Sequence, residues 1–261
     1  MNNYTKINDS IFRLTVPFED VFTSVYAIKT KDGALLFDTA TYDEDFENYT
    51  LPFLNEIGIS EDELKYVFLS HSHEDHAGGL KAILKNYPGC VVVSASSKLE
   101  EEYKNYTFLN PEDGETVLGV LKTVKIPGHT SDSMAVMDTR TNTLISGDSL
   151  QMYGLFGSGK WGANIILPNE HKKAIEKLKK MDIECILTAH DYHPHGYRFC
   201  GKAEVEKAFE LCIEPLNKIK NLILENHDLD DKEICSIYNS LDVPEIGVHV
   251  VKAVRNDFDI K

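Results

Sequence analysis

The sequence lacks the features that mark membrane, secreted or multidomain chains. No apolar stretch approaches the roughly 20 residues that span a bilayer, and the polar start MNNYTKINDS lacks the apolar core of a signal peptide. No Pro/Gly/Ser-rich linker, low-complexity run or short-period repeat divides the 261 residues. We therefore expect a cytoplasmic protein with one domain and no membrane partner.

Cysteine is scarce and irregularly spaced. The five cysteines never form a CxxC pair, so neither a disulfide framework nor a cysteine zinc site is indicated. We expect reduced and mostly buried thiols. The cysteines are Cys90, Cys185, Cys200, Cys212 and Cys235.

Positive charge is also in short supply, because 27 Lys and Arg residues face 42 Asp and Glu residues, for a formal charge of −15. Such a chain repels polyanions, so no nucleic acid partner is expected and a small-molecule substrate is favoured. Bound divalent cations would reverse this balance within one pocket. No feature of the sequence indicates an oligomeric state.

The hydrophobic pattern predicts strands interspersed with helices. Strands are expected at 11–17, 23–30, 33–39, 66–70, 91–94, 122–127, 133–138, 142–148 and 184–190. Helices are expected at 43–57 with an interruption at Pro52, and at 78–88, 97–106, 169–181 and 202–226. The last helix has an apolar stripe typical of a core-facing surface. This mixture indicates two mixed sheets covered by helices, with the topology left open.

The segment SHSHEDHAGG at 70–79 places His71, His73, Asp75 and His76 between a buried strand and a helix. Imidazole nitrogens and carboxylate oxygens are preferred ligands of zinc and related cations, and packing does not require this composition. A lone HxH would be weak evidence. HxHxDH followed by two glycines indicates a metal site.

Three more residues of the same kinds follow later strands. They are His129 in IPGHTSDS, Asp148 in LISGDS and His190 in ILTAHD. Each alone is more often a packing or turn residue than a ligand. Strand ends that empty into loops are, however, where ligand sites on open α/β sheets gather, and seven such residues in this order favour metal binding.

These motifs resemble, in order, those of the metallo-β-lactamase fold superfamily, and the resemblance covers about residues 11–200. It implies an α/β fold, an αββα sandwich of two mixed sheets flanked by helices. Residues 1–261 would form one such domain, with 202–261 as a C-terminal helical extension packed on it. His71, His73 and His129 would bind a first metal, Asp75, His76 and His190 a second, and Asp148 would bridge both.

The resemblance also assigns a supporting role to Asp38 in LLFDTA. In the family a strand-end aspartate orients the ligand loop and fixes imidazole tautomers. The alternative is simple hydrogen bonding at the end of a strand. The family's glycine after the following threonine is Ala40 here, a departure that touches no ligand.

The implied chemistry is hydrolysis of a small ester, thioester, lactone or lactam. Two divalent cations, zinc first with iron or manganese as alternatives, would share a metal-bridging hydroxide. Asp75 and Asp148 would be the catalytic carboxylates, and the resemblance is strongest to glyoxalase II-like hydrolases. An iron-dependent oxygenase similar to persulfide dioxygenases, a phosphodiesterase and a non-catalytic binding protein remain alternatives.

Two branches of the family fit less well. The 41 residues between Asp148 and His190 leave no room for the inserted domain of nuclease members. Flavodiiron proteins carry glutamate where this chain has His73.

Specificity would come from loop side chains, each of which has an equally good packing explanation. The candidates for substrate binding are Trp161, Tyr153, His193 and His195, with Tyr42 and Phe156 as further aromatic candidates. We expect His171, His227 and His249 to be surface or packing residues.

Overall fold

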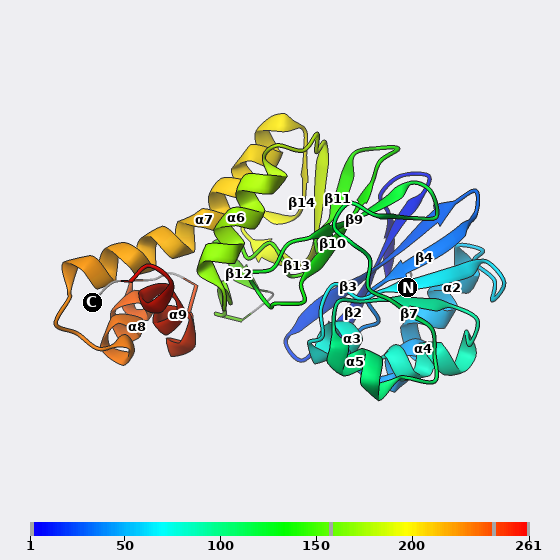
Figure 1. The fold of residues 1–261 in the computed structure, drawn as a ribbon, viewed down its shortest axis with the longest axis horizontal. Helices are drawn as coiled ribbons and strands as arrows, with labels where there is room; N and C mark the ends of the chain where they lie inside the picture. Colours follow the sequence, from blue (N-terminus) through cyan, green and yellow to red (C-terminus); the bar gives the residue numbers. More distant parts are fainter. Residues whose placement is uncertain (1–2, 157–158, 242–243, 260–261) are drawn as a thin grey trace. The chain divides into compact units, whose positions relative to one another are not determined.

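The computed structural model describes residues 3–156, 159–241 and 244–259. The chain divides into two compact units, Met1–Lys125 with Met134–Arg140, and Ile126–Ser133 with Thr141–Lys261 (Figure 1). Within the described residues, no helix is both long and apolar enough to span a bilayer. The single domain with a helical extension from residue 202 stays a prediction.

The first unit contains a mixed seven-stranded sheet. Its first four strands form an antiparallel meander, and the rest pair in parallel. A two-residue loop joins β3 and β4, because Thr30 pairs with Gly33. The strands are β1 Tyr4–Lys6, β2 Ile11–Phe18, β3 Val21–Thr30, β4 Gly33–Phe37, β5 Leu64–Phe68, β6 Val91–Val93 and β7 Phe108–Leu109.

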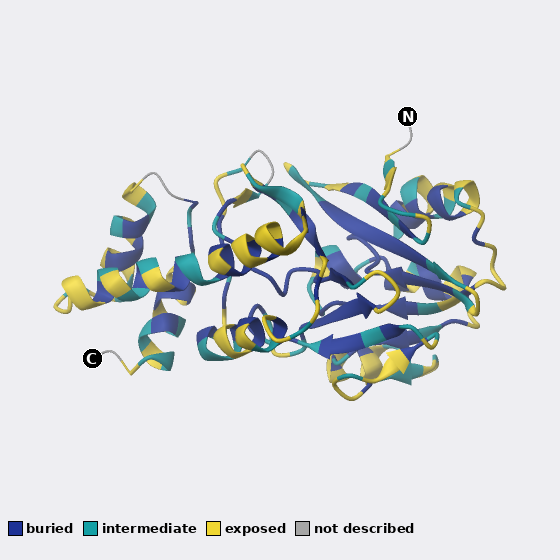
Figure 2. Ribbon diagram, turned by 90° about the horizontal axis from the view of Figure 1, so that it is seen from above, coloured by how far each residue is buried: buried dark blue, intermediate teal, exposed yellow. Residues whose placement is uncertain are grey.

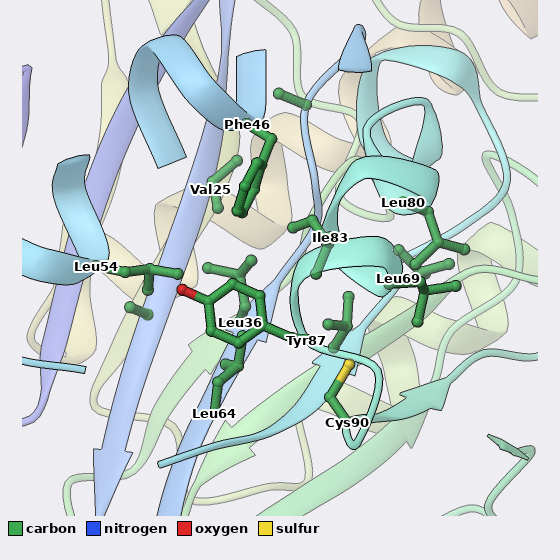
Figure 3. Packing of buried hydrophobic residues seen from close by; sticks show 14 of the residues in the cluster. Val25, Leu36, Phe46, Leu54, Leu64, Leu69, Leu80, Ile83, Tyr87 and Cys90 are labelled. Carbon is green, nitrogen blue, oxygen red and sulfur yellow. The ribbon is translucent and has the colours of Figure 1, made fainter. Parts of the chain in front are cut away.

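Helices cover this sheet and complete its core. Figure 3 shows Phe46, Leu54, Ile83 and Tyr87 around the strands that carry Leu36 and Val25. The Phe46 and Tyr87 rings meet edge to face at 6.0 Å. The helices are α1 Asp43–Asp45, the π-helix η1 Phe46–Thr50, α2 Leu51–Glu56, α3 Glu74–Ala77, α4 Leu80–Asn86 and α5 Ser97–Glu102.

The predicted helix at 43–57 is therefore three short helical pieces. The three pieces follow one another without a gap from Asp43 to Glu56, and Thr50, two residues before Pro52, has helical dihedral angles. The helical run therefore passes through Pro52, directly after the π-helical turn of η1. The first unit also contains an antiparallel ladder. Its strands are β8 Thr116–Val117, β9 Leu121–Lys125 and β10 Met134–Asp138.

The second unit contains a mixed ladder built on β13. This strand pairs in parallel with β11 and antiparallel with β12 and β14. The segment 191–198, in which His193 and His195 were expected as loop side chains, belongs to the hairpin that β13 and β14 form. The strands are β11 Thr143–Ile145, β12 Leu155–Phe156, β13 Cys185–His193 and β14 Gly196–Cys200.

The same hairpin corrects the expectation that all cysteines are reduced. Cys185 pairs with Cys200 in the β13–β14 register, their Cα atoms lie 4.1 Å apart, and a disulfide joins them. The expectation is wrong for this pair because the hairpin was not recognised. Cys90, Cys212 and Cys235 are free and buried, as expected.

Helices of the second unit form their own core. The apolar stripe of α7 packs against α8 and α9, and Figure 2 shows its buried and exposed faces alternating. Its role as core, expected from the sequence, is confirmed at Leu216, Ile219 and Ile223. The helices are α6 Pro168–Leu178, α7 Lys202–Glu225, α8 Asp231–Ser240 and α9 Val248–Asp257.

The segment after β4 crosses closely over the start of α4. Thr39 N–H donates to His76 C=O (2.8 Å), and Gly79 N–H donates to Ala40 C=O (3.2 Å). A Cβ at Gly78 would collide with the carbonyl oxygen of Thr41. The glycine pair after HxHxDH is therefore required by this backbone contact.

We expect Gly78→Ala to lower the free energy of unfolding by about 1–3 kcal/mol, because the added carbon overpacks a backbone contact that cannot yield. Gly89→Ala is the matched control, since a Cβ there meets nothing within 4 Å and the φ of Gly89 is not positive. It should stay within about 0.5 kcal/mol of the parent in urea unfolding. Equal losses in the two variants would contradict this account.

Candidate metal-binding site

The first group of candidate ligands lies on the segment that leaves β5. His71 follows the strand by three residues, and His73 is the N-cap of the single-turn helix α3, which carries Asp75 and His76. The segment is anchored by backbone bonds from Leu69 N–H to Val93 C=O (2.9 Å) and from Met134 N–H to Ser70 C=O (2.8 Å). The ligand loop is thus held both by β6 of the sheet on which it begins and by β10 of the antiparallel ladder.

Asp38, at the end of β4, accepts three hydrogen bonds from this loop while fully buried. Its donors are Ser70 N–H (2.7 Å), Ser70 Oγ–H (2.9 Å) and His76 Nδ1 (2.8 Å). Burial raises the pKa of the Asp38 carboxyl, and the neighbouring His76 and Ser70 oppose that rise. The contact predicted for Asp38 is present, and it leaves Nε2 as the ring atom of His76 that would bind a metal.

Ser70 extends the same anchoring to His71. Its hydroxyl lies 3.0 Å from His71 Nδ1 while it donates to Asp38, so the hydroxyl is placed to accept from the imidazole. Each of the two buried histidines is therefore held through Nδ1. Sequence reasoning missed Ser70, although it stands directly before the motif.

The donors of this loop converge. The ring of His71 lies 4.5 Å from that of His73 and 4.3 Å from that of His76, measured between centroids. Asp75 Oδ2 lies 3.2 Å from both His76 Nε2 and Thr23 Oγ1. Imidazole nitrogens and a carboxylate oxygen gathered this closely are donor types that divalent cations such as zinc prefer.

The second unit brings together His129, Asp148 and His190. Asp148 Oδ2 lies 3.8 Å from His129 Nε2, and Asp148 Oδ1 lies 3.2 Å from His190 Nε2. The two carboxylate oxygens thus face different histidines, as a bridging ligand requires. All three residues are buried.

His190 corrects one detail of the prediction. It lies inside β13 rather than after it, because the strand continues to His193 in pairing with β12 and β14. The β13–β14 register shifts between Leu187 and Tyr192, and such irregularities re-aim side chains at functional sites. The Phe156 ring stacks on that of His190 with centroids 5.5 Å apart.

The predicted specificity residues are more scattered. Trp161 is 56% exposed, and Tyr42 is 48% exposed. The Tyr153 ring lies under Lys218 Nζ at 4.6 Å, which is a packing role. His193 is exposed at the end of β13, and His195 lies in the following turn, where burial lowers its pKa. Of the six candidates, Phe156 contacts a candidate ligand, because its ring stacks on that of His190.

His171 is a buried histidine outside both groups, as the packing role assigned to it requires. Its Nε2 lies 3.2 Å from Cys212 C=O, and its Nδ1 has no hydrogen-bond partner among the described residues. Burial lowers the pKa of His171 to about 4. Its side chain packs against Gly128, where an added Cβ would lie 2.7 Å from His171 Cβ.

Residues 19–190 match the family model of the metallo-beta-lactamase superfamily. All seven candidate ligands lie in this range.

Three curated proteins are similar in sequence. Uncharacterized protein YobT of Bacillus subtilis is 30% identical over 38% of this chain and 52% of its own length. A hydroxyacylglutathione hydrolase of Pectobacterium carotovorum is 26% identical over 64% of this chain and 70% of its own. An atrochrysone carboxyl ACP thioesterase of Emericella nidulans is 28% identical over 51% and 41%. The chain thus spans about half of the first of these relatives and less than half of the third.

Solved structures agree on the fold. A flavo di-iron protein from Thermotoga maritima matches with a TM-score of 0.65 and 18% identity, over 83% of this chain and 61% of that one. The DIM-1 metallo-beta-lactamase matches with a TM-score of 0.62 and 18% identity, over 81% and 97%. The predicted fold, two mixed β-sheets flanked by helices, is confirmed by these similarities.

His171 should make stability depend on pH. Its folded pKa of about 4 lies below the ordinary value of 6.5, so the unfolded chain binds the extra proton between these values. The contribution of His171 to the free energy of unfolding is therefore fully present above about pH 6.5, and about 3 kcal/mol of it is lost on acidification to pH 4. Urea unfolding of metal-free His171→Gln, which keeps the donor to Cys212, should show a correspondingly smaller loss. A parallel pH profile for parent and variant would refute the assignment.

Proposed function

Since the chain belongs to the metallo-beta-lactamase superfamily, we propose that it is a dinuclear metal-dependent hydrolase of small esters, thioesters, lactones or lactams. The observation that carries this proposal is the orientation of Asp148, whose two carboxylate oxygens face His129 and His190 separately. A carboxylate with one role in packing would not require a histidine at each oxygen. Imidazole nitrogens and carboxylate oxygens are the donor types that zinc prefers.

The motif order supplies the assignment of ligands. His71, His73 and His129 would hold the first cation, and Asp75, His76 and His190 would hold the second. Asp148 would be shared between the two. Anchoring of Nδ1 on His71, His76 and His129 supports this assignment, because each ring then directs Nε2 to the metal.

The bound cations would lower the pKa of water and polarise the bond under attack. The side chains of this chain supply position and proton transfer. Asp75, held by Thr23 Oγ1, accepts a hydrogen bond from the attacking water and orients it toward the substrate carbonyl. Asp38 and Ser70 keep His71 and His76 in the ligating tautomer.

Thioesters are the first substrate class to test. Two of the similar proteins are a hydroxyacylglutathione hydrolase and an acyl carrier protein thioesterase. In such a reaction water adds to the carbonyl carbon, the C–S bond breaks, and the thiol leaves with a proton. The formal charge of −15 disfavours a polyanionic phosphodiester.

We expect the purified chain to bind two zinc ions, and Asp148→Ala to bind less, because neither site keeps its shared carboxylate. His227→Ala is the control, since His227 is exposed and contacts Asp228 rather than a candidate ligand. Uptake should weaken below about pH 6, because the ligating histidines must be neutral. Elemental analysis that saturates at one metal in the parent chain would contradict the dinuclear assignment.

Turnover should require water and no oxygen, because hydrolysis takes its oxygen atom from water and needs no electron acceptor. The measurement is an anaerobic assay of the zinc-loaded chain with small thioesters and lactones in ¹⁸O-labelled water. Label should enter the new carboxylate. Activity that appears only with iron and dissolved oxygen would support the oxygenase alternative instead.

A further inference from the structure

Gln151, the single glutamine of the chain, is fully buried three residues after the candidate ligand Asp148. Its Nε2 donates to the carbonyl oxygen of Asp148 (2.9 Å), and its Oε1 accepts from the N–H of Asn164 (2.7 Å). One side-chain amide thus joins its own segment to Asn164, which lies 13 residues further along the chain. Both of its polar atoms are used.

Asn164 carries the connection to a second candidate ligand. Its carbonyl oxygen accepts from Nδ1 of His129 (2.7 Å), which directs Nε2 of that ring toward Asp148. Three hydrogen bonds in sequence therefore run from the backbone of Asp148 through Gln151 and Asn164 to the ring of His129. At the outer end, His249 of α9 lies 2.8 Å from Asn164 Oδ1.

We propose that Gln151 is a positioning residue that sets the placement of His129 relative to Asp148 and so tunes metal affinity. The proposal rests on the proposed function, because it treats both residues as metal ligands. It goes beyond that function by assigning a role to a side chain that touches neither ligand's donor atom.

The chemistry of the amide explains why this residue type is needed. A primary amide offers a donor and an acceptor on one planar group without a change of protonation state, so it can bond a C=O and an N–H at once. Methionine fills the same space without either bond and leaves two buried backbone groups unpaired. Asparagine keeps the amide but is one methylene too short to reach both segments.

The test measures zinc binding by competition with a chromophoric chelator, and the visible spectrum of the cobalt-loaded protein. Gln151→Met should weaken zinc binding by about 10- to 100-fold and shift the cobalt bands, as loss of outer contacts to metal ligands does. Gln151→Asn should fold with a smaller loss of stability and still bind zinc more weakly than the parent. It serves as the readout if the methionine variant does not fold.

Asn239→Leu is the matched control. Like Gln151, Asn239 uses its amide to bond one backbone N–H and one backbone C=O. Both groups belong to Ile246, with distances of 3.0 Å to the N–H and 3.2 Å to the C=O. It contacts no candidate ligand, so its loss should lower stability and leave zinc affinity and the cobalt spectrum unchanged.

Two results would overturn the proposal alone: parent-like affinity and spectrum in folded Gln151 variants, or an equal loss of affinity in Asn239→Leu. A parent chain that binds no zinc would overturn the proposed function and this inference together. The first two results leave metal binding by the parent intact, so the failures are distinguishable.

Discussion

The buried carboxylate of Asp38 is the constraint on which the first ligand group depends. An isolated ionised carboxylate is too costly to bury, and three donors from Ser70 and His76 offset that cost. The donors belong to the ligand loop, so satisfying Asp38 and placing the loop are the same event. The end of β4 thereby determines where two imidazoles point.

In the second unit, the groups that hold a candidate ligand in place are neutral. His129 is held by the backbone carbonyl of Asn164, which is itself held by an amide rather than a carboxylate. The partner of His129 Nδ1 is therefore neutral, whereas the partner of His76 Nδ1 is a carboxylate. The two ligand groups therefore differ in the electrostatic support behind their histidines.

Much of this could be predicted from the sequence, because ligand motifs and apolar runs are local signals. HxHxDH with its glycine pair indicated the ligand loop, whereas the close backbone approach at Gly78 appeared only in the structure. The β13–β14 hairpin could not be predicted, because the sequence of residues 191–198, DYHPHGYR, has no strand-like alternation. Because the hairpin was not predicted, His190 was expected at the end of its strand rather than inside it, and the pairing of Cys185 with Cys200 was not expected.

The supporting side chains were harder to predict for a different reason. Gln151 and Asn164 act through backbone groups of residues far along the chain, and no spacing in the sequence marks such a contact. Ser70 and Asp38 belong to recognisable motifs, but Ser70 gains its role only when β4 lies beside β5.

Ala40 has a consequence for how such chains are detected. Its φ of +61° lies in the left-handed region, where a non-glycine residue costs about 1–2 kcal/mol. Glycine there would give back about half of that through its greater freedom in the unfolded state. The net preference for glycine at this position is therefore about 0.5–1 kcal/mol, which a folded domain can absorb. A search pattern that demands glycine at this place would discard members of the family over a difference of this size.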